Sequence, residues 1–532
     1  MTATQRGVVA AGHPVTAKAG AQVLREGGNA VDAALAAMLA SFAAEPLLTG
    51  LGAGGYLMVA GGDWEPALLD FFVEAPARAT DGSAAELHAV DVSFGDAAQV
   101  FHIGPASCGV YGTPAGVCAA SARWGTIPLA DLAAPAAELA RTGVALNKGQ
   151  AYVAKILAQL LRSTPECAAL WAPTGGGVLR EGEVIRNPDL ALALERLGAD
   201  GAEPFYRGHI ARAVSDWLGE LGGSITPDAL AGYRAVSRQP ARMVYRDRLL
   251  LTNPPPSAGG TLLAYALGLL DRRPGPPALQ QIVAAMQAAQ DERTPAFLDG
   301  LVQDGFLERF LGERLGTPSA GGAGEGPGEG AGEGPGMSAG ATGRTRPDGV
   351  GRSLGSTTHI SVLDGHGRAC SVTATNGEGS GVVVPGTGIH LNNIMGEQDL
   401  NPEGFHRHPP GRRMPSMMAP SVVIRGGEVE LVLGSAGSNR IRSALLQTIV
   451  GVVDHGLHAD AAVAAPRVHL EDDIVYAEPG IDTAPLAAAG RRIVAFHDLN
   501  LFFGGVQAVQ RRHDGELLGA GDPRRGGVAV AA

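Results

Sequence analysis

The chain has 532 residues, of which 45% are hydrophobic and 18% charged, so it can bury one large core or two lobes. A formal net charge of −12 with no basic tract argues against nucleic acid as a partner. The four cysteines show neither a CxxC pair nor metal-like spacing, so we expect no disulfide scaffold, no metal and no cofactor.

The N-terminal region is predicted to be helical. The first residues lack a charged segment followed by an apolar core and a small-residue cleavage site, so we expect a cytoplasmic location. Residues 15–44 carry a helical pattern that Gly27-Gly28-Asn29 interrupts before a second helix from Ala30. The apolar run 30–44 contains Asp32 and is too short to span a bilayer. It predicts a buried, Ala-rich helix and no association with a membrane.

The middle of the chain alternates blocks of helices and strands. A glycine-rich loop at 45–55 leads into a strand, the reverse of the strand–loop–helix order of a dinucleotide fingerprint, so it indicates close backbone packing instead. Residues 125–300 look mostly helical, with a Pro/Gly break at 252–260. After residue 356 strands return, with helices near 440–465. Such blocks indicate stacked sheets covered by helices.

Thr357 is the most informative residue of the chain. It follows the Gly/Glu-rich tract 317–352, which has too little apolar surface to order and is predicted to be disordered. It also heads a predicted hairpin whose strands meet at the turn Asp364-Gly365. Ordinary β-propensity can explain Ser-Thr-Thr, but cleavage before Thr357 would give this residue a free α-amine, the built-in base of an N-terminal nucleophile.

Several segments, in order along nearly the whole chain, resemble the γ-glutamyltransferase family of N-terminal-nucleophile hydrolases. They are Gly27–Ala34, Glu45-Pro46, Gly112–Pro114, Pro254–Ser257, Thr357–His359, Leu391–Asn393, Met418–Pro420 and Asp522–Arg525. The resemblance implies an α/β fold, a four-layer αββα sandwich made by two subunits of one precursor. The large subunit would be 1–356 and the small catalytic subunit 357–532. The two stay associated, and it remains open whether such heterodimers pair further into a homodimer.

The resemblance also assigns catalytic roles. Thr357 matches the nucleophile, which would first cleave the Ser356–Thr357 bond and later attack a small-molecule substrate. Thr375 matches the threonine that bonds to the nucleophile hydroxyl. Gly437 and Ser438 align with the two residues whose amides form the oxyanion hole. Serine in place of the second glycine keeps the N–H but restricts the backbone.

The residues that bind glutamate in the family are mostly replaced. Phe72 stands at the position of the arginine that binds the donor carboxylate, and Phe cannot make that bidentate contact. Losing the partner of a desolvated carboxylate costs about 2–5 kcal/mol in affinity. The other aligned substrate-binding positions are Asn376 (approximate, because its loop is two residues shorter), Ile394 for glutamine, Glu397 for aspartate, Ser416, and Met417 for serine. We expect a pocket for a less polar acyl group, unless Arg413, Arg440 or another arginine compensates.

The sequence therefore predicts a threonine hydrolase with an altered substrate. One chemistry is amide hydrolysis or acyl transfer, as in the cephalosporin-acylase-like branch that the chain resembles. The other is carbon–carbon cleavage of a keto-acid intermediate, as in the similar enzymes of alkylproline (lincomycin- and pyrrolobenzodiazepine-type) antibiotic biosynthesis. A true γ-glutamyl enzyme and a non-catalytic binding relative are the alternatives. The presence of both Thr357 and Thr375 argues against the last.

Overall fold

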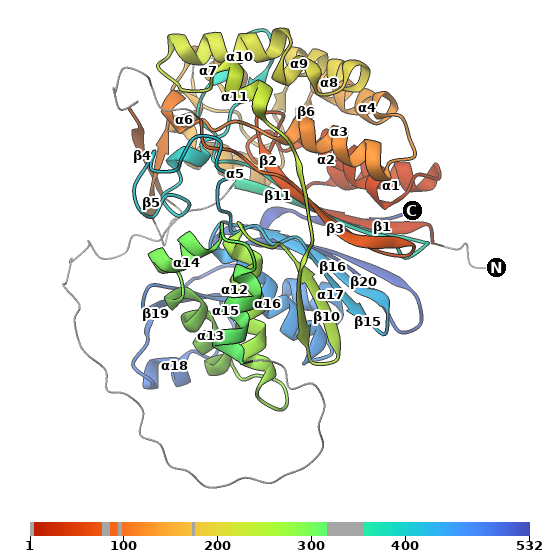
Figure 1. Ribbon diagram of the computed structural model, residues 1–532, viewed down its shortest axis with the longest axis vertical. Coiled ribbons are helices and arrows are strands. Elements are labelled where there is room, and N and C mark those ends of the chain that lie inside the picture. The colour runs from red at the N-terminus through yellow and green to blue at the C-terminus, as the bar shows by residue number, and fades with distance from the viewer. Residues whose placement is uncertain (1–4, 77–85, 94–97, 173–175, 317–355) are drawn as a thin grey trace.

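The computed structural model describes residues 5–76, 86–93, 98–172, 176–316 and 356–532. Two sheets face each other, and helices cover both outer faces (Figure 1). This confirms the predicted αββα sandwich. The tract 317–352, predicted to be disordered, lies outside the described residues.

The first sheet has seven antiparallel strands drawn from both sides of the predicted cleavage site. Their order is β22 (Val528–Ala531), β1 (Gly7–Ala11), β11 (Ser356–Asp364), β12 (Ala369–Gly377), β2 (Gly54–Gly61), β3 (Trp64–Phe71) and β8 (Val236–Arg238). The predicted hairpin is thus β11–β12. It lies at the centre of the sheet, with β1 on one side and β2 on the other, so the two predicted subunits share one sheet.

The second sheet packs against β11 and β12 through its strands β16 and β20. Its order is β21 (Leu517–Gly521), β20 (Gly505–Arg511), β16 (Glu428–Ala436), β15 (Ser421–Arg425), β10 (Arg248–Thr252) and β9 (Ala241–Tyr245). Small sheets at the periphery contain β4 (His88–Ser93) with β5 (Ala98–Ile103), β6 (Val144–Ala145) with β7 (Val184–Ile185), β13 (Val383–Val384) with β14 (Ile389–His390), and β17 (Val468–Glu471), β18 (Ile474–Ala477) and β19 (Arg492–Ala495).

Helices α1 (Pro14–Arg25) and α2 (Ala30–Ala44) cover the outer face of the first sheet. Asn29 caps α2 by accepting hydrogen bonds from the N–H groups of Val31 and Asp32, and Asp32 in turn accepts from the N–H of Asn29. Every residue of α2 is buried. The predicted break and the buried Ala-rich helix are both confirmed, and no described helix has the length and apolarity to cross a membrane.

The remaining helices extend both outer layers (Figure 1). On the side of α1 and α2 are α3 (Thr113–Trp124), α4 (Leu129–Thr142), α5 (Lys148–Ile156), α6 (Ala158–Leu161), α7 (Pro165–Trp171), α8 (Pro188–Asp200), α9 (Glu203–Tyr206), α10 (His209–Glu220) and α11 (Pro227–Gly232). On the side of the second sheet are α12 (Ala258–Asp271), α13 (Leu279–Asp291), α14 (Pro295–Gly300), α15 (Phe306–Leu315), α16 (Arg440–Val453), α17 (Ala459–Ala464) and α18 (Ala484–Ala488). The helices predicted in 125–300 and near 440–465 are confirmed.

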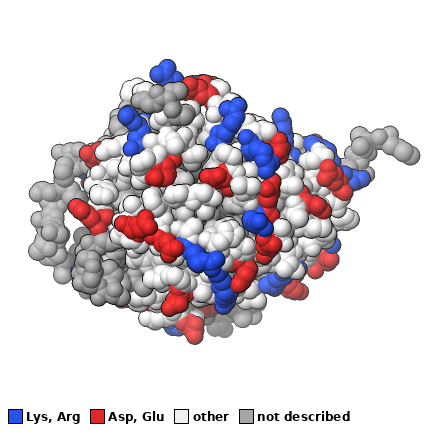
Figure 2. Space-filling view, turned by 90° about the horizontal axis from the view of Figure 1, so that it is seen from above, with Lys and Arg blue, Asp and Glu red and all other residues white. Residues whose placement is uncertain are grey.

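The surface seen in Figure 2 carries mixed charges. Basic and acidic side chains are interspersed over the described residues of this face, without a continuous basic surface.

Candidate active site

Thr357, at the start of strand β11, lies directly opposite Thr375 of β12. The two residues are paired in the β11–β12 register, and the register shifts between Ser356 and Thr357. The turn that joins the strands is closed by Asp364, whose side chain accepts hydrogen bonds from the N–H groups of His366 and Arg368. Because this turn sets the register, it also sets which residue of β12 faces the predicted nucleophile.

The Thr375 hydroxyl contacts both the predicted nucleophile and the predicted cleavage site. Thr357 Oγ1 donates to Thr375 Oγ1 at 3.1 Å, and Thr375 Oγ1 donates to the carbonyl oxygen of Ser356 at 2.6 Å. The N–H of Gly377 donates to the same hydroxyl at 2.9 Å. One side chain is thus placed to accept a proton from Thr357 and to polarise the carbonyl that Thr357 would attack.

The face of β11 that carries Thr357 looks toward the second sheet. His359, two residues along, lies there against Gly434 of β16 and shares a 2.7 Å hydrogen bond with Thr373. Burial lowers the pKa of His359 to about 3, so its imidazole is neutral at ordinary pH. It is a structural link between the sheets and puts no positive charge beside the threonine pair.

The opposite face of β11 is held by Glu45. Its carboxylate accepts from the hydroxyl of Thr358 at 2.8 Å and from that of Thr16 at 2.6 Å. Burial raises the pKa of Glu45. The strand that presents Thr357 is therefore fixed to α1 and to the end of α2. The sequence showed Glu45 as part of a motif but gave no sign of this contact.

The predicted oxyanion residues form the turn between β16 and α16. Gly437 has φ +121°, and a Cβ there would lie 2.9 Å from Cα of Gly504, so glycine is required. Ser438 has φ +50°, a left-handed conformation that serine rarely adopts. Its hydroxyl donates to Asp399 at 3.2 Å. Asp399, which the sequence did not single out, thereby helps to fix the turn.

Arg293 ties this turn to a second segment. Its guanidinium donates to the side chain of Asn439 at 3.2 Å and to the carbonyl oxygen of Asp399 at 3.1 Å. Arg293 follows α13, in the part of the chain before the predicted cleavage site, whereas its two partners follow it. The oxyanion turn therefore depends on contacts across that site.

The three polar-to-apolar positions belong to one apolar core. Phe72, Ile394 and Met417 are 0%, 0% and 4% exposed and lie in the same buried cluster. The ring of Phe72 stacks on Tyr56 with centroids 5.5 Å apart. Ser416, which precedes Met417, uses its hydroxyl to accept from the N–H of Met418. These side chains offer packing rather than charge.

Glu397 lies beside the end of β12. A Cβ on Gly377 would be 2.6 Å from Glu397 Oε1. The carboxyl of Glu397 therefore lies beside Gly377, which follows Thr375 by two positions in the chain. Burial, together with the nearby carboxylates of Glu378 and Asp399, raises its pKa well above the usual range.

Among the described residues, no group of three or more His, Cys, Asp or Glu side chains is arranged to hold a metal ion.

The side chain of Asn376 points away from the other predicted substrate-binding residues, although its carbonyl oxygen accepts from the N–H of Asn393, next to Ile394. Its side chain lines a separate hollow together with Thr49 and His390. Adjacent strand residues alternate between faces, so Asn376 points away from the Thr375 side. That alternation was readable from the sequence and would have separated the two residues.

Arg413, one of the predicted compensating arginines, already has partners. Its guanidinium donates to the carbonyl oxygen of Phe72 and to the Tyr233 hydroxyl. It also lies 3.2 Å from a Glu74 oxygen and 3.5 Å from an Asp70 oxygen. These carboxylates already balance its charge. Arg440 is likewise engaged: its Nε donates to the carbonyl oxygen of Phe502, and its guanidinium stacks on that ring.

Comparison with known proteins gives one consistent result. The family model for gamma-glutamyltranspeptidase matches residues 16–532. Acylase ACY 1 proenzyme of Pseudomonas sp. (strain SE83) is 32% identical, over 99% of this chain and 93% of its own length. Glutathione hydrolase proenzyme of Escherichia coli (strain K12) is 30% identical, over 98% and 90%. The crystal structure of cephalosporin acylase from Bacillus halodurans superposes with a TM-score of 0.80 at 25% identity, over 99% and 96%. Together these findings make the chain a hydrolase or transferase.

Proposed function

We propose, from the premise that the chain belongs to the gamma-glutamyltranspeptidase family, that it is an autoprocessed threonine hydrolase whose acyl pocket no longer suits γ-glutamyl donors. The observation that carries the proposal is the Thr375 hydroxyl, bonded at once to Thr357 Oγ1 and to the Ser356 carbonyl oxygen. An ordinary β-face threonine needs neither bond.

Self-cleavage starts from this arrangement. Thr357 Oγ1 attacks the carbonyl carbon of Ser356, while the Thr375 hydroxyl stabilises the oxyanion that forms. The hydroxyl proton passes through Thr375 Oγ1 to the Thr357 nitrogen as the C–N bond breaks. Water then hydrolyses the resulting ester. The products are a large subunit ending at Ser356 and a small subunit, 357–532, with a free amine on Thr357.

Turnover reuses the same atoms. The α-amine takes the proton of Thr357 Oγ1 as this oxygen attacks the substrate carbonyl, and the amides of Gly437 and Ser438 stabilise the oxyanion. As the intermediate collapses, the leaving group of the substrate takes that proton from the α-ammonium and departs, and the acyl group stays on Thr357 as an ester. Water, deprotonated by the α-amine, then hydrolyses the ester and releases the acid. No cofactor takes part in these steps.

The substrate is an apolar acyl compound. Phe72, Ile394 and Met417 replace polar groups of the family pattern, and Arg413 is held by Asp70 and Glu74. Our first candidate is a conjugated keto acid of alkylproline antibiotic biosynthesis: Thr357 attacks the keto carbonyl, and a conjugated imine accepts the electron pair of the broken C–C bond. The second is amide hydrolysis of an apolar acyl donor, which the 32% identity to Acylase ACY 1 favours.

Steady-state kinetics on three donors tests the altered pocket. Wild type, Phe72→Arg and the apolar control Phe72→Leu are compared on a γ-glutamyl anilide, an apolar acyl anilide and a conjugated keto acid. We expect wild type and Phe72→Leu to prefer one of the latter two, and Phe72→Arg to gain on the γ-glutamyl compound. If wild type has its highest kcat/KM on the γ-glutamyl anilide, the chain is a γ-glutamyl enzyme with a relocated carboxylate anchor.

A further inference from the structure

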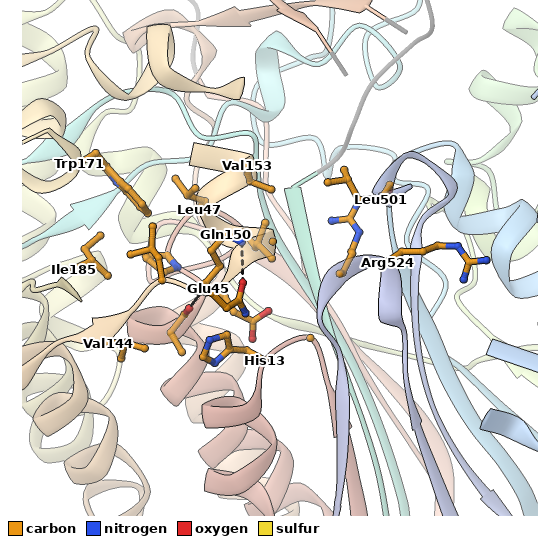
Figure 3. A pocket seen from close by; sticks show the side chains of 18 residues that line it. His13, Glu45, Leu47, Val144, Gln150, Val153, Trp171, Ile185, Leu501 and Arg524 are labelled. Carbon is orange, nitrogen blue, oxygen red and sulfur yellow. Dashed lines mark hydrogen bonds between the residues drawn. The ribbon is translucent and has the colours of Figure 1, made fainter. Parts of the chain in front are cut away.

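A narrow hollow lies on the other side of β11 from the threonine pair. Its walls come from residues 12–185 and from 501–525, so both predicted subunits form it. Figure 3 shows Trp171, Ile185 and Val144 at one end and Leu501 toward the other, with Glu45 and Gln150 between them. Its cavity volume is about 40 Å³.

This hollow reaches the residue next to the predicted nucleophile, on the opposite face of β11. Glu45, in its wall, is hydrogen-bonded to Thr358, the residue after Thr357. A Cβ on Gly12, also in the wall, would lie 3.7 Å from Thr358 Oγ1. A molecule held here would therefore lie along the start of β11.

Most of the hollow is apolar. The side chains of Leu47, Leu146, Val153, Trp171 and Ile185 line it and belong to one buried cluster. Such walls accept an aromatic or alkyl body and give no hydrogen bonds to a polar one.

Two adjacent arginines at its other end differ sharply in their contacts. Arg524 is saturated: it donates to Glu478, to Asp522 and to the carbonyl oxygens of Val463 and Ala465. Arg525 makes one weak bond among the described residues, from Nη2 to the carbonyl oxygen of Leu501 at 3.4 Å. Its Nε is buried there without a hydrogen-bond partner. A buried donor without an acceptor is costly unless a ligand or water supplies one.

The fold holds Arg525 in this under-bonded position. The hydrogen bonds of Arg524 fix the short turn Pro523–Arg525. A Cβ on Gly505 would lie only 2.3 Å from Arg525 Cδ, so glycine at this position leaves room for the Arg525 side chain.

Asp522 and Glu45 are the nearby carboxylates. The oxygens of Asp522 are taken by Arg467, Arg524 and the N–H of Val506. Those of Glu45 are taken by the hydroxyls of Thr16 and Thr358. Burial, and then repulsion from Arg440, lowers the pKa of Arg525 to about 10, so it stays charged at neutral pH.

We propose that this hollow is a second binding site, for a ligand that carries a carboxylate on an apolar body, with Arg525 binding the carboxylate. The site goes beyond the proposed function, because its occupant would lie against Thr358, on the face of β11 opposite the threonine pair, and is not the molecule that Thr357 attacks.

Binding of 4-phenylbutyrate and of its neutral amide, 4-phenylbutyramide, tests this inference. Both are titrated calorimetrically into purified wild type, Arg525→Gln, Arg525→Lys and the exposed-arginine control Arg212→Gln. We expect wild type and Arg212→Gln to bind the acid at least about tenfold more tightly than the amide. Arg525→Gln should lose this preference, and Arg525→Lys should keep part of it, which separates loss of the anchor from loss of the fold.

Two further measurements fix the location and the ligand class. 4-Phenylbutyrate should change the tryptophan fluorescence of wild type, and Trp171→Phe should lose that change. Inorganic phosphate should bind more weakly than the acid, because it has no apolar body. Equal affinity for acid and amide in wild type, a preference that survives in Arg525→Gln, or phosphate binding as tight as that of the acid would each overturn the proposal. No turnover is involved, so an inactive or uncleaved protein that keeps the acid preference would contradict the proposed function and leave this second site standing.

Discussion

The start of β11 and the apolar cluster around Phe72 follow opposite designs. At the strand, Thr357, Thr375 and the Ser356 carbonyl form a continuous hydrogen-bonded chain. Phe72, Ile394 and Met417 instead pack together in one buried apolar cluster. Bond-making chemistry needs fixed donors and acceptors, whereas recognition of an apolar group needs only a matching surface. On the proposed function, the substrate that is recognised has changed while the geometry of the reactive groups has stayed.

Loss of the Thr357 hydroxyl should have the largest effect on activity. Thr357→Ala leaves no oxygen to attack Ser356 or a substrate, so we expect turnover of the preferred donor to fall to background. Thr357→Ser keeps a hydroxyl and should retain part of the activity. Donor kinetics on both variants measures this. Wild-type turnover by Thr357→Ala would show that another residue is the nucleophile.

The next largest effect is expected from loss of the Thr375 hydroxyl, which bonds to both Thr357 and the Ser356 carbonyl oxygen. Thr375→Val is nearly isosteric but cannot donate to the Ser356 carbonyl, and loss of one such donor costs about 10²-fold in rate. Thr373→Val, on the same strand and face, loses a bond to His359 instead and serves as control. The rate of chain cleavage, followed by gel, should slow in the first variant only. Equal rates in the two variants would make Thr375 a strand residue like any other.

The oxyanion turn gives a smaller effect, on stability. Ser438→Gly relieves the left-handed conformation, whereas Ser438→Ala keeps it, and both lose the bond to Asp399. The left-handed conformation costs a non-glycine residue about 1–2 kcal/mol. In urea unfolding, the free energy of unfolding of Ser438→Gly should therefore exceed that of Ser438→Ala by about 1 kcal/mol. Equal free energies of unfolding in the two variants would show that the backbone at residue 438 is not strained.

The smallest expected effect is the contribution of Glu397 to the pH dependence of stability. The raised pKa of Glu397 means that the folded chain binds its proton more tightly than the unfolded chain does. The stabilisation is complete below the ordinary glutamate range and is lost as pH rises through the folded pKa. Glu397→Gln should flatten this fall in a series of thermal unfolding midpoints against pH. The exposed control Glu403→Gln should follow wild type, and a Glu397→Gln series parallel to wild type would exclude a raised pKa.

Much of the fold was predictable because its signals are local. The glycine break before Ala30, the buried helix that follows and the hairpin at Asp364 come from short-range patterns, and the structure has all three. The pairing of Thr357 with Thr375 follows from that hairpin. The bond from Thr358 to Glu45 was not predictable, because it joins residues 313 positions apart.

The candidate site was harder to predict where side-chain partners decide the role. Arg413 and Arg525 look alike in the sequence, yet Arg413 lies against Asp70 and Glu74, whereas Arg525 has a single hydrogen bond of 3.4 Å, to the carbonyl oxygen of Leu501. Only the packed structure shows which guanidinium is already neutralised. Asn376 is a different case, since the alternation of side chains along a strand is enough to predict that its side chain and that of Thr375 point to opposite faces of the sheet.

The proposed cleavage before Thr357 is tested by N-terminal sequencing and intact-mass measurement of the purified wild-type protein. We expect two fragments, the smaller one beginning Thr-Thr-His-Ile-Ser, because Thr357 cleaves the bond that precedes it. A single chain near 54.1 kDa, or a small fragment that begins at any other residue, would contradict it.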